Sequence, residues 1–206
     1  MTSVWSATAE ILQYRALEGD VSCDVVVIGG GWIGLTTSLL LAQDGADVFL
    51  VEAGRLASRT SGNTTGKVTS QHGAIYAALA DRHGAAVARL YAEANQAAVA
   101  QVAELAERLT IDCELSKTSS FVYTTDPASD LMPEAQAASS LGLPAQLVDG
   151  QEVGVPAATA VRFDDQVHLH PVRYLAGLAR ALTGAGARVH EQTRAISVED
   201  RMAGSR

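Results

Sequence analysis

The sequence predicts an α/β protein with a parallel sheet, and three observations within residues 21–54 support this fold class. Residues 25–28 form an uncharged β-branched run, the pattern of a strand buried on both faces at the centre of such a sheet. A glycine-rich turn follows and leads into an apolar helix that Gly45 ends. Residues 48–51 then form a second apolar strand. This βαβ order is typical of a Rossmann-like domain.

The turn between the first strand and the helix has the spacing G-x-G-x-x-G, at Gly29, Gly31 and Gly34. The first glycine allows a tight turn, the second lets a pyrophosphate approach the backbone, and the third lets the helix pack closely on the strand. Unpaired N–H groups at the start of the helix attract phosphate oxygens. Glu52, 18 residues after Gly34, suits a carboxylate that binds a ribose 2′-OH. We therefore predict a dinucleotide site; the alternative is a packing corner that binds nothing.

Composition agrees with a cytoplasmic enzyme. The 206 residues are 48% hydrophobic and 18% charged, enough for a core of one large domain or one and a half. The net charge of −8 argues against nucleic acid as a partner. No apolar run reaches about 18 residues, so no membrane span is expected, and residues 1–20 lack the pattern of a secretory signal. Cys23 and Cys113 are expected to be reduced structural thiols.

The rest of the chain alternates loops, helices and strands. Residues 55–73 are rich in Ser, Thr, Gly and Asn, which predicts a long functional loop. Residues 74–109 predict a helix whose core-facing apolar stripe is Val87, Leu90, Tyr91, Ala94, Ala98, Val102, Leu105 and Leu109. The later segments predict a strand or hairpin over 111–126, a helix from Pro127 to Ser140, strands near 146–148 and 158–163, a helix over 171–185, and one or two strands over 188–198.

This order suggests a dinucleotide domain with a second, mixed α+β domain inserted into it. The predicted divisions are an N-terminal segment 1–20, the first part of the dinucleotide domain 21–110, a partial substrate domain 111–168, and a return to the dinucleotide domain 169–206.

Several longer motifs resemble one family, the FAD-dependent oxidoreductases of the glycine/D-amino-acid oxidase (DAO) type. The most specific are "TSGNTTGKVTSQHG", "LYAEANQAA" and "RFDDQVHLHPVRYLAGLAR", and the similarity runs from about Trp5 to Arg194. It is strongest to the branch whose members carry a C-terminal Rieske iron–sulfur domain. The resemblance implies FAD as cofactor. It implies these cofactor-binding residues: Gly29, Gly31, Trp32, Ile33 and Gly34 at the pyrophosphate, Glu52 and Ala53 at the adenosine ribose, Thr60, Ser61, Thr64 and Thr65 along the pyrophosphate and ribityl chain, and Ala195 at the adenine.

The chain departs from this family in two ways. Trp32 and Ile33 replace a smaller pair, and "GGGWIGL" is similar to the NADH-binding turn of pyridine-nucleotide disulfide reductases, so an NAD(P)H-binding domain is the alternative. The hydroxyl-rich loop downstream favours FAD.

Family members are also considerably longer than this chain. The resemblance therefore implies that the chain is an N-terminal part whose C-terminal part is missing, and that this part is inactive alone. A non-catalytic fragment is a further alternative. No Cys-x-His and Cys-x-x-His pair occurs, so no Rieske cluster is expected.

The resemblance implies oxidation of an amine or amino acid by hydride transfer to the flavin. His72 follows the loop and is the candidate catalytic acid or base, with a structural histidine as the alternative. His168 and His170 form an H-x-H pair near Gln166, but no ligand cluster accompanies it, so no metal is predicted. The resemblance implies a small amine or amino acid as the substrate, and the oligomeric state is not set by the sequence.

Overall fold

A computed structural model describes residues 3–10 and 12–199, which form two compact units. Of these residues, the first unit contains 3–10, 12–65, 109–113 and 170–199, and the second contains 66–108 and 114–169. Residues 66–108 thus group with the second unit, because their long helix packs on elements of that unit. The assignment of the units as a cofactor domain and a substrate domain stays a prediction.

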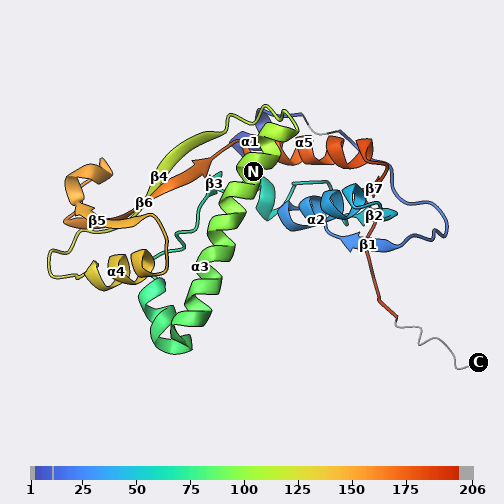
Figure 1. Ribbon diagram of the computed structural model, residues 1–206. Coiled ribbons are helices and arrows are strands. Elements are labelled where there is room, and N and C mark those ends of the chain that lie inside the picture. The colour runs from blue at the N-terminus through green and yellow to red at the C-terminus, as the bar shows by residue number, and fades with distance from the viewer. Residues whose placement is uncertain (1–2, 11, 200–206) are drawn as a thin grey trace, which may run out of the picture. The chain divides into compact units, whose positions relative to one another are not determined.

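The first unit contains a parallel sheet, which confirms the predicted α/β class (Figure 1). Its strands are β1 (Val25–Ile28), β2 (Val48–Val51) and β7 (Arg188–His190), in the order β1-β2-β7. Strand β2 is the central one, and all four of its residues are buried. In the described residues β1 lies at the edge, with Val26 55% and Ile28 58% exposed. The expectation of a central β1 buried on both faces is therefore wrong, since β2 pairs on both sides.

Helices α2 (Trp32–Gln43) and α5 (Pro171–Gly184) pack against each other in this unit. Gly45 ends the α2 region as predicted, with a positive φ of 91°. Helix α5 also begins at the predicted proline, whose missing N–H is tolerated in the first turn. The buried side chains of these elements are mostly leucines, with two aromatic residues among them: Leu35, Leu39, Leu50, Leu175, Leu178, Leu182, Phe49 and Tyr174.

The segments that flank this sheet are short. Helix α1 (Val4–Ala7) opens the described chain, and the loop after β2 contains a 3-10 turn, η1 (Thr60–Asn63). The terminal strand ends at His190, so the strand expected to continue to residue 198 is wrong beyond that point. Residues 192 and 193 instead donate N–H bonds to the carbonyls of Gly54 and Glu52, at the end of β2.

The second unit contains an antiparallel sheet. Its strands are β3 (Lys67–Val68), β4 (Ser116–Thr124), β5 (Ala145–Asp149) and β6 (Thr159–His168); β6 pairs with the other three. A 3-10 turn, η2 (Gly150–Val153), joins β5 to the segment before β6. Helices α3 (Tyr76–Arg108) and α4 (Met132–Ser140) complete the unit. The core residues are Tyr76, Ala88, Ala92, Ala135, Ala138, Leu141, Leu143, Val161 and Phe163.

Two predictions for the helices of this unit need correction. Helix α3 is interrupted at Gly84, whose φ is 81°, and it buries Ala88 and Ala92 rather than Val87 (48% exposed) and Leu90 (68% exposed). The small alanines allow α4 to approach closely, so the predicted stripe is only partly the buried face. Helix α4 begins at Met132 and not at Pro127.

Glu134, on α4, is a buried carboxylate with a structural task. Its Oε1 accepts the N–H groups of Ile75 (3.0 Å) and Tyr76 (2.9 Å), and its Oε2 accepts that of Ala77 (2.9 Å). These are N–H groups that the start of α3 leaves without intrahelical acceptors. Glu134 therefore caps α3 from a different helix.

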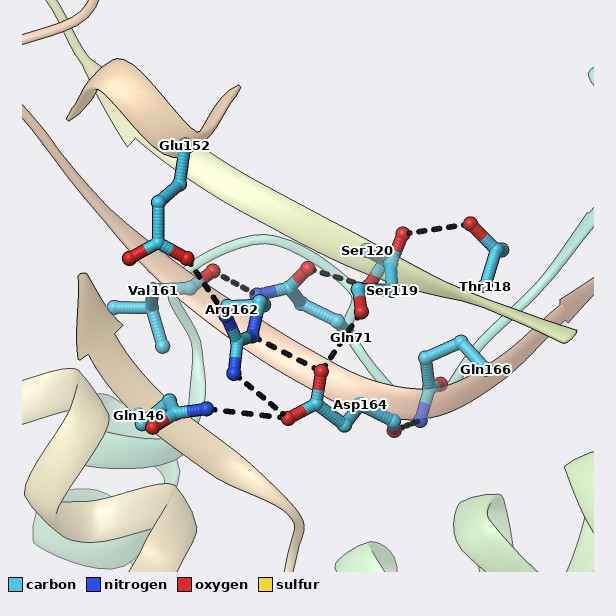
Figure 2. A network of polar contacts seen from close by, with 10 residues as sticks. All are labelled: Gln71, Thr118, Ser119, Ser120, Gln146, Glu152, Val161, Arg162, Asp164 and Gln166. Atoms are coloured by element: carbon cyan, nitrogen blue, oxygen red, sulfur yellow. Dashed lines mark hydrogen bonds and ion pairs between the residues drawn. The ribbon is translucent and has the colours of Figure 1, made fainter. Parts of the chain in front are cut away.

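A polar network surrounds β6 (Figure 2). Arg162 forms ion pairs with Glu152 (2.6 Å) and Asp164 (3.0 Å), and Asp164 also accepts from the Ser119 hydroxyl (2.7 Å). The hydroxyl of Ser119, followed by the Arg162 guanidinium, holds the pKa of Asp164 below its ordinary value. A register shift between residues 118 and 120 places Asp165 at a positive φ of 55°. Residues 164 and 165 of β6 thus lie opposite the single residue 119 of β4, as in a β-bulge.

Candidate functional site

The glycine-rich turn lies at the carboxyl end of β1 and opens α2. Gly29 has a positive φ of 108°, and Gly31 precedes the first helical residue, Trp32. The first intrahelical bond runs from Leu35 N to Gly31 O (3.0 Å). The N–H groups of Trp32, Ile33 and Gly34 therefore have no intrahelical acceptor and lie at the positive end of the helix dipole. This end of α2 can bind an anion.

Close packing requires glycine at two positions of this turn. A Cβ on Gly34 would lie 1.8 Å from the carbonyl oxygen of Gly29, and a Cβ on Gly30 would lie 2.1 Å from Leu56 Cδ2. At Gly31 a Cβ would meet only Ser61 Oγ, at 2.8 Å, which is the tip of a side chain. Gly31 thus faces the loop rather than the core, so its missing side chain leaves room where a ligand could approach the backbone.

Glu52 lies at the end of β2, beside the turn. Its Oε2 accepts the N–H of Gly30 (2.8 Å), and its Oε1 accepts the N–H of Gly54 (2.7 Å). Each carboxylate oxygen still has acceptor capacity for a ribose hydroxyl. The structure therefore gives Glu52 a second task that sequence reasoning missed, because the carboxylate also ties the glycine turn to the end of β2.

The loop after β2 presents hydroxyl groups that the protein leaves unsatisfied. Among residues 3–10 and 12–199, none of the side-chain hydroxyls of Thr60, Ser61, Thr64 and Thr65 has a hydrogen-bond partner. Ser61 approaches Gly31, as the distance above shows. Free hydroxyls in a loop that reaches an anion-binding helix end at Ser61 suit phosphate and ribityl oxygens.

Arg59 and Glu191 belong to this region and were not identified from the sequence. Arg59 lines a small pocket of about 40 Å³ with Gly30, Gly31 and Ser61, and it forms no ion pair within the described chain. Glu191 is 1% exposed and accepts from Arg55 Nη1 (2.7 Å) and Leu56 N (2.7 Å). In the structure Glu191 directly follows β7 as Glu52 follows β2, but the strands expected over 188–198 did not mark this position.

The remaining predicted cofactor residues are Trp32, Ile33, Ala53 and Ala195. The Trp32 ring stacks on Tyr174 of α5 (4.9 Å between centroids), while the Ile33 side chain is 84% exposed. Ala53 lies half-buried beside Glu52, and Ala195 lies exposed in the segment after β7. Burial raises the pKa of Tyr174, so its hydroxyl stays protonated. Trp32 therefore has a packing role on α5, which explains why a large residue is accommodated here.

His72 belongs to the second unit, in the segment between β3 and α3. Its Nδ1 lies 2.9 Å from the hydroxyl of Tyr91, and the two rings meet edge to face at 6.2 Å. The side chain is exposed. A histidine held at Nδ1 keeps Nε2 available for proton exchange. Its role as acid or base stays a prediction.

The H-x-H pair has other tasks. His170 is the N-cap of α5, while His168 lies in β6 opposite Lys67 and Ser116. Gln166 is buried and accepts the N–H of Ser70 (2.8 Å). In the part of the chain that the structure describes, no three His, Cys, Asp or Glu side chains are grouped to hold a metal. Over the same residues, no helix combines the length and apolarity that crossing a bilayer requires.

The parallel sheet, the glycine turn and the acid at the end of β2 define the class of protein, a dinucleotide-binding α/β protein. Comparison with known families defines it further. The family described as "FAD dependent oxidoreductase" (DAO) matches residues 24–206, so this chain belongs to that family. Its cofactor is FAD, and the alternative of an NAD(P)H-binding domain is set aside.

The chain is similar to several known proteins over nearly all of its length. It is 32% identical to YhfW of Bacillus subtilis strain 168, named as a Rieske 2Fe-2S iron–sulfur protein, over 95% of this chain and 39% of that protein. It is 26% identical to gamma-glutamylputrescine oxidoreductase of Escherichia coli K12, over 96% and 48%. The chain therefore spans less than half the length of these relatives.

Solved structures support the fold. L-amino acid deaminase from Proteus myxofaciens superposes with a TM-score of 0.66 at 18% identity, over 90% of this chain and 41% of that one. At this identity the likeness shows the fold alone. The chain thus has the fold of the corresponding part of that structure.

Proposed function

We propose that the first unit binds FAD along the glycine turn and the 59–65 loop, and that the protein oxidises a small amine or amino acid. The observation that carries this proposal is the presence in the first unit of two sets of unsatisfied polar groups, which meet where Ser61 lies beside Gly31. These are the first-turn N–H groups of α2 and the four free hydroxyls of the loop. When bound, FAD supplies the acceptor for the hydride that leaves the substrate.

Each group has a distinct part in holding the cofactor. The N–H groups of residues 32–34 bind the pyrophosphate, and Arg59 adds positive charge beside them. Glu52 accepts from the ribose hydroxyls with the oxygen lone pairs that Gly30 and Gly54 leave open. The hydroxyls of Thr60, Ser61, Thr64 and Thr65 bind phosphate and ribityl oxygens, and Ala195 lies at the adenine.

The substrate class follows from the relatives. One of them is named for a glutamylated diamine and a structural neighbour for L-amino acids, and both substrates contain an amine. His72 is the proposed acid or base for the amine, with Tyr91 fixing its Nδ1. The low cysteine content of the chain, two residues in 206, favours the cytoplasm as the location.

The test is a titration of the purified chain with FAD, followed by flavin fluorescence, alongside the Gly31→Val variant. A branched side chain at Gly31 blocks the approach of a pyrophosphate, so the variant is expected to lose at least tenfold in affinity. NADH serves as the competing ligand. Tight binding of NADH with no binding of FAD would overturn the proposal.

The reaction is tested by anaerobic mixing of the FAD-loaded protein with γ-glutamylputrescine, glycine and a panel of L-amino acids. Residues 1–206 alone are expected to be inactive, so loss of flavin absorbance with one of these amines is expected from a chain that spans the full length of the relatives. A protein that holds FAD but is bleached by none of them, and instead by a non-amine alcohol or 2-hydroxy acid, would overturn the proposed substrate class.

A further inference from the structure

The N-terminal segment contacts the proposed cofactor loop directly. The indole Nε1 of Trp5 donates to the carbonyl of Thr64 (2.7 Å), and the hydroxyl of Ser3 donates to the carbonyl of Gly62 (2.6 Å). Both contacts join residues 59 positions apart within the first unit. They bind backbone carbonyls of the loop, so the loop hydroxyls stay free.

The same segment is anchored at the start of α5. His170 accepts the N–H of Arg173 at Nδ1 (3.2 Å), so its hydrogen lies on Nε2, which is 3.0 Å from Thr8 Oγ1. Thr8 in turn donates its hydroxyl hydrogen to the carbonyl of Val4 (2.7 Å). The Trp5 and His170 rings meet edge to face at 5.0 Å. The segment therefore bridges the loop and α5.

The loop needs such support because it bends tightly where it contacts the segment. Gly62 is buried, and a Cβ there would lie 1.9 Å from the carbonyl oxygen of Ala57. Between residues 60 and 65 only a single 3-10 turn provides regular structure. A loop with little regular structure loses conformational entropy when it orders around a ligand, and an element that orders it beforehand increases affinity.

We propose that the side chains of Ser3, Trp5 and Thr8 form a positioning element of the cofactor site, and that Trp5 is its principal residue. The segment orders the 60–65 loop before FAD binds, so that the loop hydroxyls and the N–H end of α2 face one ligand. This inference rests on the proposed function, since it assumes that this loop is the cofactor loop. No residue of the segment is required to touch the cofactor.

The first measurement is the dissociation constant for FAD of Trp5→Phe and Ser3→Ala. Trp5→Phe removes the indole N–H and keeps an aromatic ring against His170, so the dissociation constant is expected to rise about three- to tenfold. Ser3→Ala is expected to give about a threefold rise. Val4→Ala is the matched control, because Val4 lies in the same segment with 63% of its surface exposed. It is expected to bind FAD like the original chain.

A second measurement needs no cofactor. Amide hydrogen exchange over residues 60–66 of the FAD-free protein is expected to become faster in Trp5→Phe and to stay unchanged in Val4→Ala. Leu182→Val, a buried substitution in α5, controls for a general loss of stability. It is expected to lower the melting temperature without a selective change in this loop.

These two measurements separate the inference from the proposed function. If the original chain does not bind FAD, the proposed function fails, while the exchange data still test whether the segment orders the loop. Wild-type affinity for FAD in Trp5→Phe would overturn the inference, and so would unchanged exchange in the loop. If Trp5→Phe does not fold, Ser3→Ala decides by the same two criteria.

Discussion

The two units use the same kinds of polar side chain in opposite ways. In the first unit, the hydroxyls of the 60–65 loop have no protein partner within the described residues. In the second unit, Ser120 donates to Gln71 (2.6 Å), Gln71 donates to the carbonyl of Val161 (2.9 Å), and Ser70 bonds to Gln96 (2.8 Å). Paired polar groups stabilise a fold, while unpaired groups beside a helix N-terminus are available to a ligand. The difference teaches that hydroxyl-rich composition alone does not identify a binding loop.

The largest effect on the first unit is expected at Gly34, where the structure leaves no room for a side chain. Gly34→Ala places a Cβ 1.8 Å from the Gly29 carbonyl oxygen, so the turn must open. We expect a loss of more than about 3 kcal/mol of stability and no detectable FAD binding. Thermal melting and FAD titration measure the two effects. Gly184→Ala is the control, since a Cβ there meets nothing within 4 Å. A Gly34→Ala protein as stable as this control would show that the turn differs from the one described.

Glu134 tests the second unit, in which buried polar groups are paired. Glu134→Ala leaves the N–H groups of residues 75–77 without their acceptor, and we expect a loss of about 2–3 kcal/mol. Chemical denaturation measures this loss. Glu134→Gln retains one accepting oxygen and should lose less. FAD affinity of the folded variants should not change, so a selective loss of affinity would contradict a purely structural role for this carboxylate.

Glu52 combines the two uses of polar groups. Its carboxylate is paired within the protein, and it still has acceptor capacity for a ligand. Glu52→Ala should lower stability by about 1–2 kcal/mol, since the N–H groups of Gly30 and Gly54 lose their acceptor. It should also weaken FAD binding about tenfold. Melting of the FAD-free protein separates the two effects. If the loss of FAD affinity is fully explained by the loss of stability of the FAD-free protein, Glu52 only holds the turn together and does not bind the cofactor.

Asp164 has the smallest expected effect. Its folded-state pKa is lowered below the unfolded value near 3.8, chiefly by the Ser119 hydroxyl. A lowered pKa means that the stabilisation by Asp164 is complete above the unfolded pKa. It is lost as the pH falls through the lower pKa of the folded state. Because the side chain is 39% exposed, solvent screening keeps the contribution below about 1 kcal/mol.

The measurement is chemical denaturation of Asp164→Asn and the original chain between pH 3 and pH 6. The two stabilities should differ most at pH 6 and converge toward pH 3. A difference that grows as the pH falls would mean that the pKa of Asp164 is raised rather than lowered in the folded protein.

The sequence by itself determined the features that depend on neighbouring residues. The strand, the glycine turn, the helix and the acid at Glu52 follow one another within about one βαβ unit, so local patterns specify them. The start of α5 follows from Pro171 for the same reason. Longer motifs added the family and with it FAD.

Only the tertiary structure decided the features that depend on distant residues. The spacing of apolar residues predicts an apolar stripe on α3. Packing in the core that α3 shares with α4 buries the small alanines at 88 and 92 instead of the larger residues of that stripe. The central position of β2 depends on β7, which lies about 140 residues later in the chain. The task of Glu191 and the contacts of Trp5 with the loop likewise join segments far apart in sequence. No local pattern encodes such pairings, because they arise only when the chain closes long loops to bury its apolar surface.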